Sequence, residues 1–232
     1  MLAFLLLILP LGLGLGGVLS PRPQDLAQKF AQVSDARASD DFSTELTGLD
    51  LILDYEPWRG SQWQRIGRLY LDTHQPGRAV DALEKADTLG ALDAQGMLWL
   101  ADALLQNGDK QACREVLKDL PTKDAFILNQ AAALLRQAGD LQQAEEKIKL
   151  AYEIDPLNPE INYLLGLMQI AEDPEAARNH FSVAQNEERR REAARYLSRM
   201  IDLYYDRIIN AEWLISVGKA LEQVGEWDVA VR

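Results

Sequence analysis

The sequence predicts an all-α protein: an α-solenoid of antiparallel helix hairpins preceded by one apolar N-terminal helix. The prediction rests on apolar residues at helical spacing in residues 63–86, and on small residues that recur at nearly constant intervals further along the chain. Composition agrees, because the 232 residues include only 9 prolines and 15 glycines and few alternating β-branched runs.

The clearest hairpin lies in residues 63–86. Its first helix presents one face made of Trp63, Ile66, Gly67 and Tyr70. Its second helix presents Ala79, Leu83 and Ala86 at the same spacing. Small residues at positions 67 and 79 leave room for the two helices to approach closely. One hairpin cannot bury its own apolar faces, so stacked copies are expected.

Copies follow in one register. Gly67 is echoed by Ala101, Ala132 and Gly166, at separations of 34, 31 and 34 residues. Ala79 is echoed by Cys113, Ala144 and Ala177, at separations of 34, 31 and 33 residues. Glycine followed by aspartate, at 108–109 and 139–140, provides the turn inside two of these copies, where glycine ends one helix and aspartate caps the next.

On these residues the chain resembles the tetratricopeptide repeat (TPR) family. The family pattern W-x2-L-G-x2-Y…A-x3-F…P is met by Trp63, Ile66, Gly67, Tyr70, Ala79 and Leu83, although Ala91 replaces the final proline. The resemblance implies a superhelix of hairpins whose first helices line a concave groove that binds a protein or peptide partner.

The register predicts the organisation of the chain. Residues 1–20 are expected to be a signal anchor or signal peptide, and residues 21–58 a linker and a degenerate N-terminal helical hairpin. Four repeats are expected at 60–93, 94–124, 125–158 and 159–185, followed by an extra amphipathic helix at 186–210. Residues 211–232 read as the start of a further repeat, which predicts that the array continues beyond Arg232.

The N-terminal segment is predicted to target a membrane. Residues 2–19 carry no charged side chain, and as a helix they would reach roughly 27 Å against a hydrocarbon thickness of about 30 Å. A single-pass N-terminal anchor is favoured, with the side of the membrane left open. The alternative is export after signal cleavage, although the Ser20–Pro21 junction is a poor cleavage site.

Charge and residue content exclude several functions. The net charge of −12 argues against a nucleic-acid partner, and a single cysteine forms no internal disulfide. His74, His180 and Cys113 lie at no metal-ligand spacing, so neither a metal nor a cofactor is expected. We therefore predict that the chain is not an enzyme.

Partner binding is predicted on the inward positions of the first helices, which mix apolar side chains with amides and charges. These positions are Gln64, Arg68, Gln95, Leu98, Asp102, Phe126, Asn129, Arg136, Tyr163 and Leu167. The lysine- and asparagine-rich pattern of TPR modules that clamp chaperone tails is missing. Leu98 and Leu167 have a second interpretation, since they could simply pack against neighbouring helices.

A second candidate surface is an arginine stripe in the extra helix. Arg191, Arg195 and Arg199 recur at intervals of four residues. The simpler interpretation is a solvated face paired with Glu187 and Glu192. The alternative is a docking patch for an acidic partner.

Together these features predict a membrane-tethered scaffold that binds partner proteins or peptides through its concave groove, for assembly or recruitment of a membrane or cell-envelope complex. The rival is a non-catalytic docking or regulatory tail of a larger membrane enzyme, such as a glycan-assembly protein.

Overall fold

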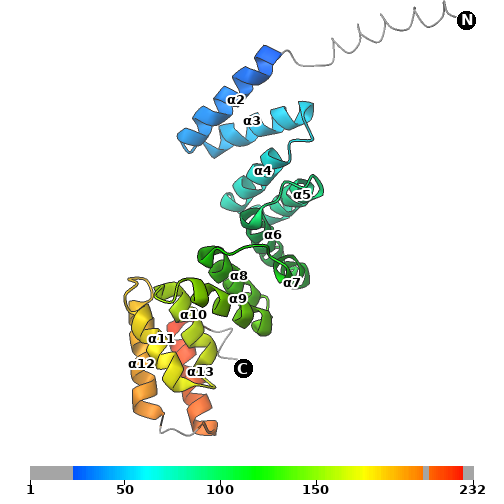
Figure 1. Ribbon diagram of the computed structural model, residues 1–232. Helices are drawn as coiled ribbons and strands as arrows, with labels where there is room; N and C mark the ends of the chain where they lie inside the picture. Colours follow the sequence, from blue (N-terminus) through cyan, green and yellow to red (C-terminus); the bar gives the residue numbers. More distant parts are fainter. Residues whose placement is uncertain (1–22, 206–208, 227–232) are drawn as a thin grey trace, which may run out of the picture. The chain divides into compact units, whose positions relative to one another are not determined.

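The computed structural model describes residues 23–205 and 209–226, and within these ranges the chain is all α (Figure 1). Twelve helices are present in the described residues, most of them paired in hairpins. The described residues form two compact units, divided between Gly96 and Met97. The boundary falls inside α6 (Ala94–Gln106).

The first unit is built from two hairpins. In the first, α2 (Pro23–Ala38) pairs with α3 (Phe42–Tyr55), and in the second, α4 (Gly60–Asp72) pairs with α5 (Pro76–Thr88). The side chain of Asp41 accepts a hydrogen bond from the backbone N–H of Thr44 and so caps α3. Pro76 opens α5, where its missing N–H costs nothing.

The turn of the first hairpin is short, because α2 continues to Ala38 and α3 begins at Phe42. Asp40 then reverses the chain with a φ of 54°, a left-handed conformation that aspartate tolerates better than most residues.

Close helix approach at the small-residue positions is confirmed. A Cβ added to Gly67 would lie 2.4 Å from the Leu83 Cγ, and one added to Gly166 would lie 2.6 Å from Phe181 Cε1. Both partner side chains are fully buried. In these two hairpins, therefore, the second helix packs directly onto the glycine of the first.

In the second unit, α6 is followed by α7 (Lys110–Lys118), α8 (Ala125–Gln137), α9 (Leu141–Ile154), α10 (Pro159–Gln169) and α11 (Pro174–Ala184). Here α8 pairs with α9 and α10 pairs with α11. The second helix of each hairpin is capped in the same way. The side chains of Asp109, Asp140 and Asp173 accept the backbone N–H three residues further on.

The last two described helices are α12 (Arg191–Tyr204) and α13 (Ala211–Val224). α12 packs on α11, and α13 packs on α12 with the Tyr205 and Trp213 rings 5.1 Å apart. The extra helix predicted at 186–210 corresponds to α12 in the described residues, and it buries Ala194, Leu197 and Ile201, whereas Tyr204 is exposed.

The predicted anchor, residues 1–20, also lies outside the described residues. Among the helices that the structure does describe, none has the length and hydropathy that a membrane crossing requires.

Candidate functional site

The candidate site is a hollow of about 190 Å³ between α8 and α10, here called the α8–α10 pocket. α8 contributes Asn129, Gln130, Ala133 and Arg136, which share one helical face. α10 contributes Glu160, Tyr163, Leu164 and Leu167, again one face. Arg190 and Glu226 complete the lining. Four of the residues predicted to bind a partner, Asn129, Arg136, Tyr163 and Leu167, are thus brought together.

Glu226, which follows α13, brings a carboxylate into the lining of the pocket. Its Oε2 accepts a hydrogen bond from Arg136 Nη1 at 3.0 Å, and its Oε1 accepts one from the Tyr163 hydroxyl at 3.1 Å. Arg190 Nη1 donates to Oε1 at 3.4 Å. Both carboxylate oxygens are therefore held by donors from three separate segments. We call Arg136, Tyr163, Arg190 and Glu226 the carboxylate cluster.

The cluster is largely removed from water. Glu226 is only 7% exposed and Tyr163 only 3%, and the Arg136 side chain is 11% exposed. The Arg190 side chain remains 48% exposed. Burying a carboxylate is costly unless charged donors satisfy it, and here two guanidinium groups do so. Arg190 is therefore the member that solvent reaches most easily.

Tyr163 is held in its neutral, hydrogen-donating form. Burial raises the pKa of its phenol well above the ordinary value, and the negative charge of Glu226 raises it further. Arg190 and Arg136 oppose this shift but do not cancel it. The guanidinium carbon of Arg190 also lies 4.7 Å from the centre of the Tyr163 ring, in a cation–π arrangement.

Glu226 was not predicted from the sequence, although a signal for it exists. It stands four residues before Ala230, as Asp109, Asp140 and Asp173 stand four residues before the small residue of their own second helix. In those three copies the acidic side chain caps the helix that it precedes. The Glu226 carboxylate accepts a hydrogen bond from a residue 90 positions earlier in the chain.

The other predicted groove residues of the first unit have local partners. Gln64 donates its amide to Asp93 Oδ1 at 3.0 Å and accepts the Asp93 N–H at 3.3 Å, so it fastens α4 to the segment before α6. Arg68 pairs with Asp72 one turn along the same helix. Gln95 is half-buried.

In the second unit the predicted residues divide by exposure. Leu98, Tyr163 and Leu167 are buried, so the structure does not offer them as open platforms. Asp102 accepts a hydrogen bond from Gln106 on its own helix. Phe126 is 55% exposed and shares the α8 face of Asn129, which leaves it accessible at the start of that helix.

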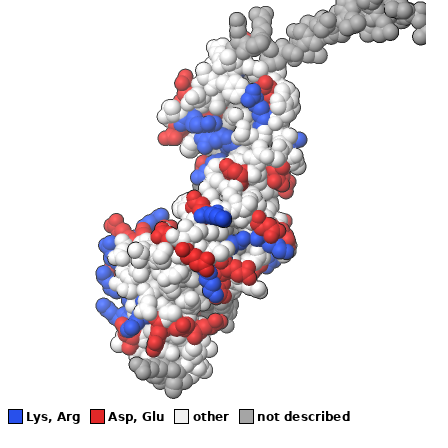
Figure 2. All heavy atoms as spheres, in the orientation of Figure 1, with Lys and Arg blue, Asp and Glu red and all other residues white. Residues whose placement is uncertain are grey.

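The arginine stripe has mixed partners. Arg191 donates to the Gln185 carbonyl, and Arg195 pairs with Glu192, whose side chain is 81% exposed. Arg199 is exposed. Figure 2 shows acidic and basic side chains interspersed over the face in view rather than separated by sign.

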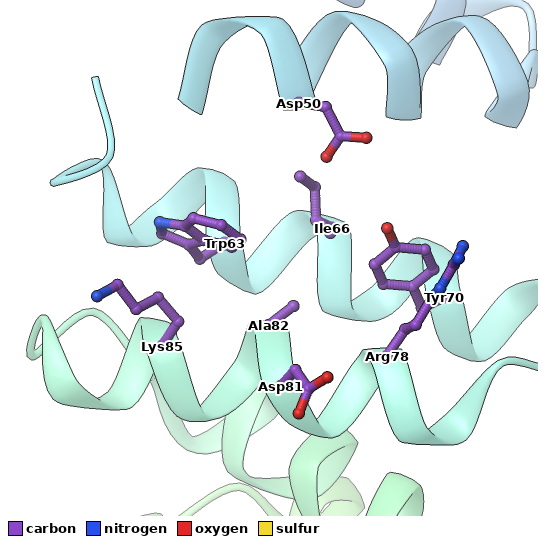
Figure 3. Close-up of a pocket in the computed structure, with 8 residues that line it drawn as sticks. All are labelled: Asp50, Trp63, Ile66, Tyr70, Arg78, Asp81, Ala82 and Lys85. Carbon is purple, nitrogen blue, oxygen red and sulfur yellow. The ribbon is translucent and has the colours of Figure 1, made fainter. Parts of the chain in front are cut away.

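A second hollow, of about 570 Å³, lies in the first unit between α3 and α5 (Figure 3). Trp63, Ile66 and Tyr70 of α4 form its floor, with Asp50 on one side and Arg78 on the other. Burial raises the pKa of Asp50, and the charge of Asp54 adds to this, while Arg78 opposes it. Trp63, Ile66 and Tyr70 belong to the packing face predicted for α4, so the repeat's own packing accounts for this hollow.

Outside the carboxylate cluster, titratable side chains are relevant as metal ligands and as nucleophiles. The described residues contain no group of three or more side chains that could hold a metal ion. Cys113 is buried, and burial raises the pKa of its thiol to about 11, which disfavours the nucleophilic thiolate.

No protein-family model matches the sequence, and no curated protein matches it. Solved structures do match. MamA superposes with a TM-score of 0.61 at 20% identity, over 72% of this chain and 93% of MamA. YrrB, described as a TPR protein with an unusual peptide-binding site, gives a TM-score of 0.61 at 18% identity, over 72% of this chain and 88% of YrrB.

PilW, described as a widely conserved type IV pilus biogenesis factor, gives a TM-score of 0.57 at 13% identity, over 90% of each chain. None of these three proteins is described as an enzyme. At this level of identity the likeness establishes the fold: the chain is folded as TPR-repeat proteins are.

Proposed function

We propose that this chain is a membrane-tethered scaffold that binds a partner protein or peptide in the groove formed by α8 and α10. The observation that carries the proposal is the α8–α10 pocket, where polar groups from two helices converge. The pocket lining combines two guanidinium groups and two amides with Leu164, and the exposed Phe126 shares the α8 face of Asn129. Such a mixture suits an extended peptide, whose backbone needs hydrogen bonds and whose side chains need apolar contacts.

The likeness to YrrB and PilW supports this proposal at the level of architecture. YrrB is described by a peptide-binding site, and PilW by a role in pilus biogenesis. We infer by analogy that this chain is a repeat scaffold that binds peptides and helps to build a cell-envelope assembly.

Tethering is the second part of the proposal. Residues 2–19 are uncharged and apolar enough to enter a membrane, and attachment would raise the local concentration of whatever the groove binds. If the segment is an anchor, the full-length chain should stay in the membrane fraction with an intact N-terminus. A mature N-terminus near residue 21, found by mass spectrometry, would instead show cleavage and export.

Photocrosslinking tests the groove. A photoreactive amino acid replaces Phe126, which is exposed beside the pocket, and in a matched control it replaces Leu150 on α9, which is similarly exposed at 47%. We expect position 126 to capture a defined partner that position 150 does not. The same capture should weaken when Asn129→Leu removes the Asn129 amide from the pocket. Equal labelling at both positions, or capture that Asn129→Leu does not affect, would contradict groove binding.

A further inference from the structure

We propose that the carboxylate cluster is the specificity-determining part of the groove, that Glu226 occupies it as a ligand supplied by the chain itself, and that a partner binds by replacing Glu226 with an acidic side chain of its own. This inference rests on the proposed function and names the chemistry of the partner: a peptide segment carrying a glutamate or aspartate side chain.

The first argument is the position of Glu226 in the repeat. Asp109, Asp140 and Asp173 occupy the equivalent position and hydrogen-bond to the start of their own helices. Glu226 is one methylene longer, and its two carboxylate oxygens accept hydrogen bonds from residues 90 and 63 positions earlier in the chain. Donors so distant in sequence hold this carboxylate as a pocket holds a ligand.

The second argument is the donor set. Arg136, Arg190 and the Tyr163 hydroxyl all donate toward the same two oxygen atoms. Guanidinium groups have no acceptor, so an anion is the group that satisfies them. In a protein of net charge −12, two arginines converging on one buried point are a specific carboxylate site rather than part of a general basic surface.

The third argument is that the pocket has room and unmet polar capacity beside the bound carboxylate. Its volume is about 190 Å³. The Asn129 Oδ1 atom, buried in the lining, has no hydrogen-bond partner among the described residues. A partner's backbone N–H would satisfy that oxygen while its acidic side chain reaches Arg136 and Arg190, which gives the partner a contact that Glu226 does not make.

Exchange requires only a local movement. Gly225 ends α13 in the left-handed conformation, with φ at 84°, and Glu226 follows it directly. The remainder of α13 is held separately, through the face of Trp213 and Val217 that is buried in the unit. Glu226 can therefore leave the cluster by rotation about the Gly225 backbone while α13 stays in place.

The test uses the full chain and a synthetic peptide of residues 219–226, acetylated and amidated so that its terminal carboxylate is absent. A control peptide carries glutamine at the position of Glu226. Binding is measured by fluorescence anisotropy to the wild type, to Glu226→Gln, and to Glu222→Gln, a matched loss of one exposed α13 charge.

We expect Glu226→Gln to bind the glutamate peptide about tenfold more tightly than the wild type does, because the competing internal carboxylate is gone. Glu222→Gln should behave as the wild type. Adding Arg190→Ala to Glu226→Gln should reverse the gain, and Arg190 is exposed enough for this change to leave the fold intact. Far-UV circular dichroism confirms folding, and Glu226→Asp, with a shorter reach, should give an intermediate affinity if Glu226→Gln unfolds.

Equal binding of the two peptides to Glu226→Gln, or equal affinity of Glu226→Gln and Glu222→Gln for the glutamate peptide, would overturn the inference. If photocapture at Phe126 succeeds while the peptides are not distinguished, only the exchange of Glu226 is refuted. If the peptides are distinguished but no partner is captured at Phe126, the site stands and the proposed scaffold function is refuted.

Discussion

Two buried glutamates show how single residues organise each unit. Glu45 in the first unit is fully buried, as Glu226 nearly is in the second. Glu45 accepts bonds from Arg65 at 2.8 and 2.7 Å and from Arg37 at 2.7 Å. Burial raises the pKa of the Glu45 carboxyl, but hydrogen bonds and charge from Arg65 and Arg37 outweigh burial and hold the pKa below its ordinary value. Each unit thus joins separate helices through a carboxylate and two arginines.

Glu45→Gln should destabilise the first unit. The substitution keeps the shape but removes the charge that two guanidinium groups share, and we expect a loss of about 2 kcal/mol. Because the folded pKa is lowered, the contribution of Glu45 is present above its ordinary pKa of 4.5 and is lost as the pH falls through the folded value. Urea unfolding at neutral and acid pH measures both effects.

Glu192→Gln is the matched control, since its partner Arg195 is also exposed and the pair contributes little. A loss for Glu45→Gln no larger than that of Glu192→Gln would show that the buried cluster is not important for stability.

His180 predicts a pH dependence closer to neutrality. Its ring lies against Tyr152 at 5.3 Å and its Nδ1 is 2.7 Å from Asn162 Oδ1. Burial lowers the pKa of His180 below its ordinary value of 6.5, although Asp173 opposes this. The unfolded chain therefore takes up the proton first, so stability is full above pH 6.5 and declines as the pH falls toward the folded pKa.

His180→Gln should flatten that decline, measured as the melting temperature between pH 7.5 and pH 5. His74→Asn, which changes an exposed turn residue, should keep the wild-type profile. Parallel profiles for the wild type and His180→Gln would assign the decline to other groups.

At the scale of the helices, stability depends on the close approach that glycine permits. The interior of α4 is an unfavourable place for glycine in an isolated helix, by about 1 kcal/mol relative to alanine. Its presence at position 67 is explained by Leu83, whose Cγ would lie 2.4 Å from an added Cβ.

Gly67→Ala should therefore destabilise the chain despite the better helix propensity, by about 1–2 kcal/mol. In the background of Leu83→Ala, which removes the obstructing atoms, the same change should become neutral or stabilising. The two single variants and the double variant, compared by chemical denaturation, give the coupling between the positions. Additive losses would mean that the close contact does not limit packing at this hairpin.

The helices were largely predictable because their signals are local. The spacing and size of four residues, Trp63, Gly67, Ala79 and Leu83, are enough to predict a hairpin. An aspartate that follows a glycine predicts where the second helix of a hairpin begins. The site was only partly predictable. The face shared by Asn129 and Arg136, which both line the pocket, follows from helical periodicity. The burial of Tyr163 does not follow from periodicity.

The reason is that burial at the groove depends on contacts across long sequence separations. Glu226 meets Tyr163 at a separation of 63 residues and Arg136 at one of 90. Nothing in the local pattern around Arg190 distinguishes it from other surface charges. Glu226 shares its position with Asp109, Asp140 and Asp173, which identifies it as an acidic turn residue. The residues that its carboxylate contacts, however, are determined by the tertiary structure.

At the scale of the whole molecule, the chain is two compact units whose boundary lies within α6. Repeat arrays derive stability from each repeat and its nearest neighbours, so a change should act mainly where it is made. Each unit carries its own buried glutamate cluster, which provides one matched substitution for each unit: Glu45→Gln and Glu226→Gln.

Hydrogen exchange should show this independence directly. Glu45→Gln is expected to accelerate exchange in α2, α3 and α4 and to leave α8 and α10 protected, whereas Glu226→Gln should do the reverse. The free-energy losses of the double variant should equal the sum of the single losses within about 0.5 kcal/mol, because the two clusters share no partner. Loss of protection across both units from either single change would mean that the array unfolds as one cooperative body. In that case, displacement of Glu226 by a partner would change the stability of α4. The groove would then be coupled to the end of the chain that we propose is held at the membrane.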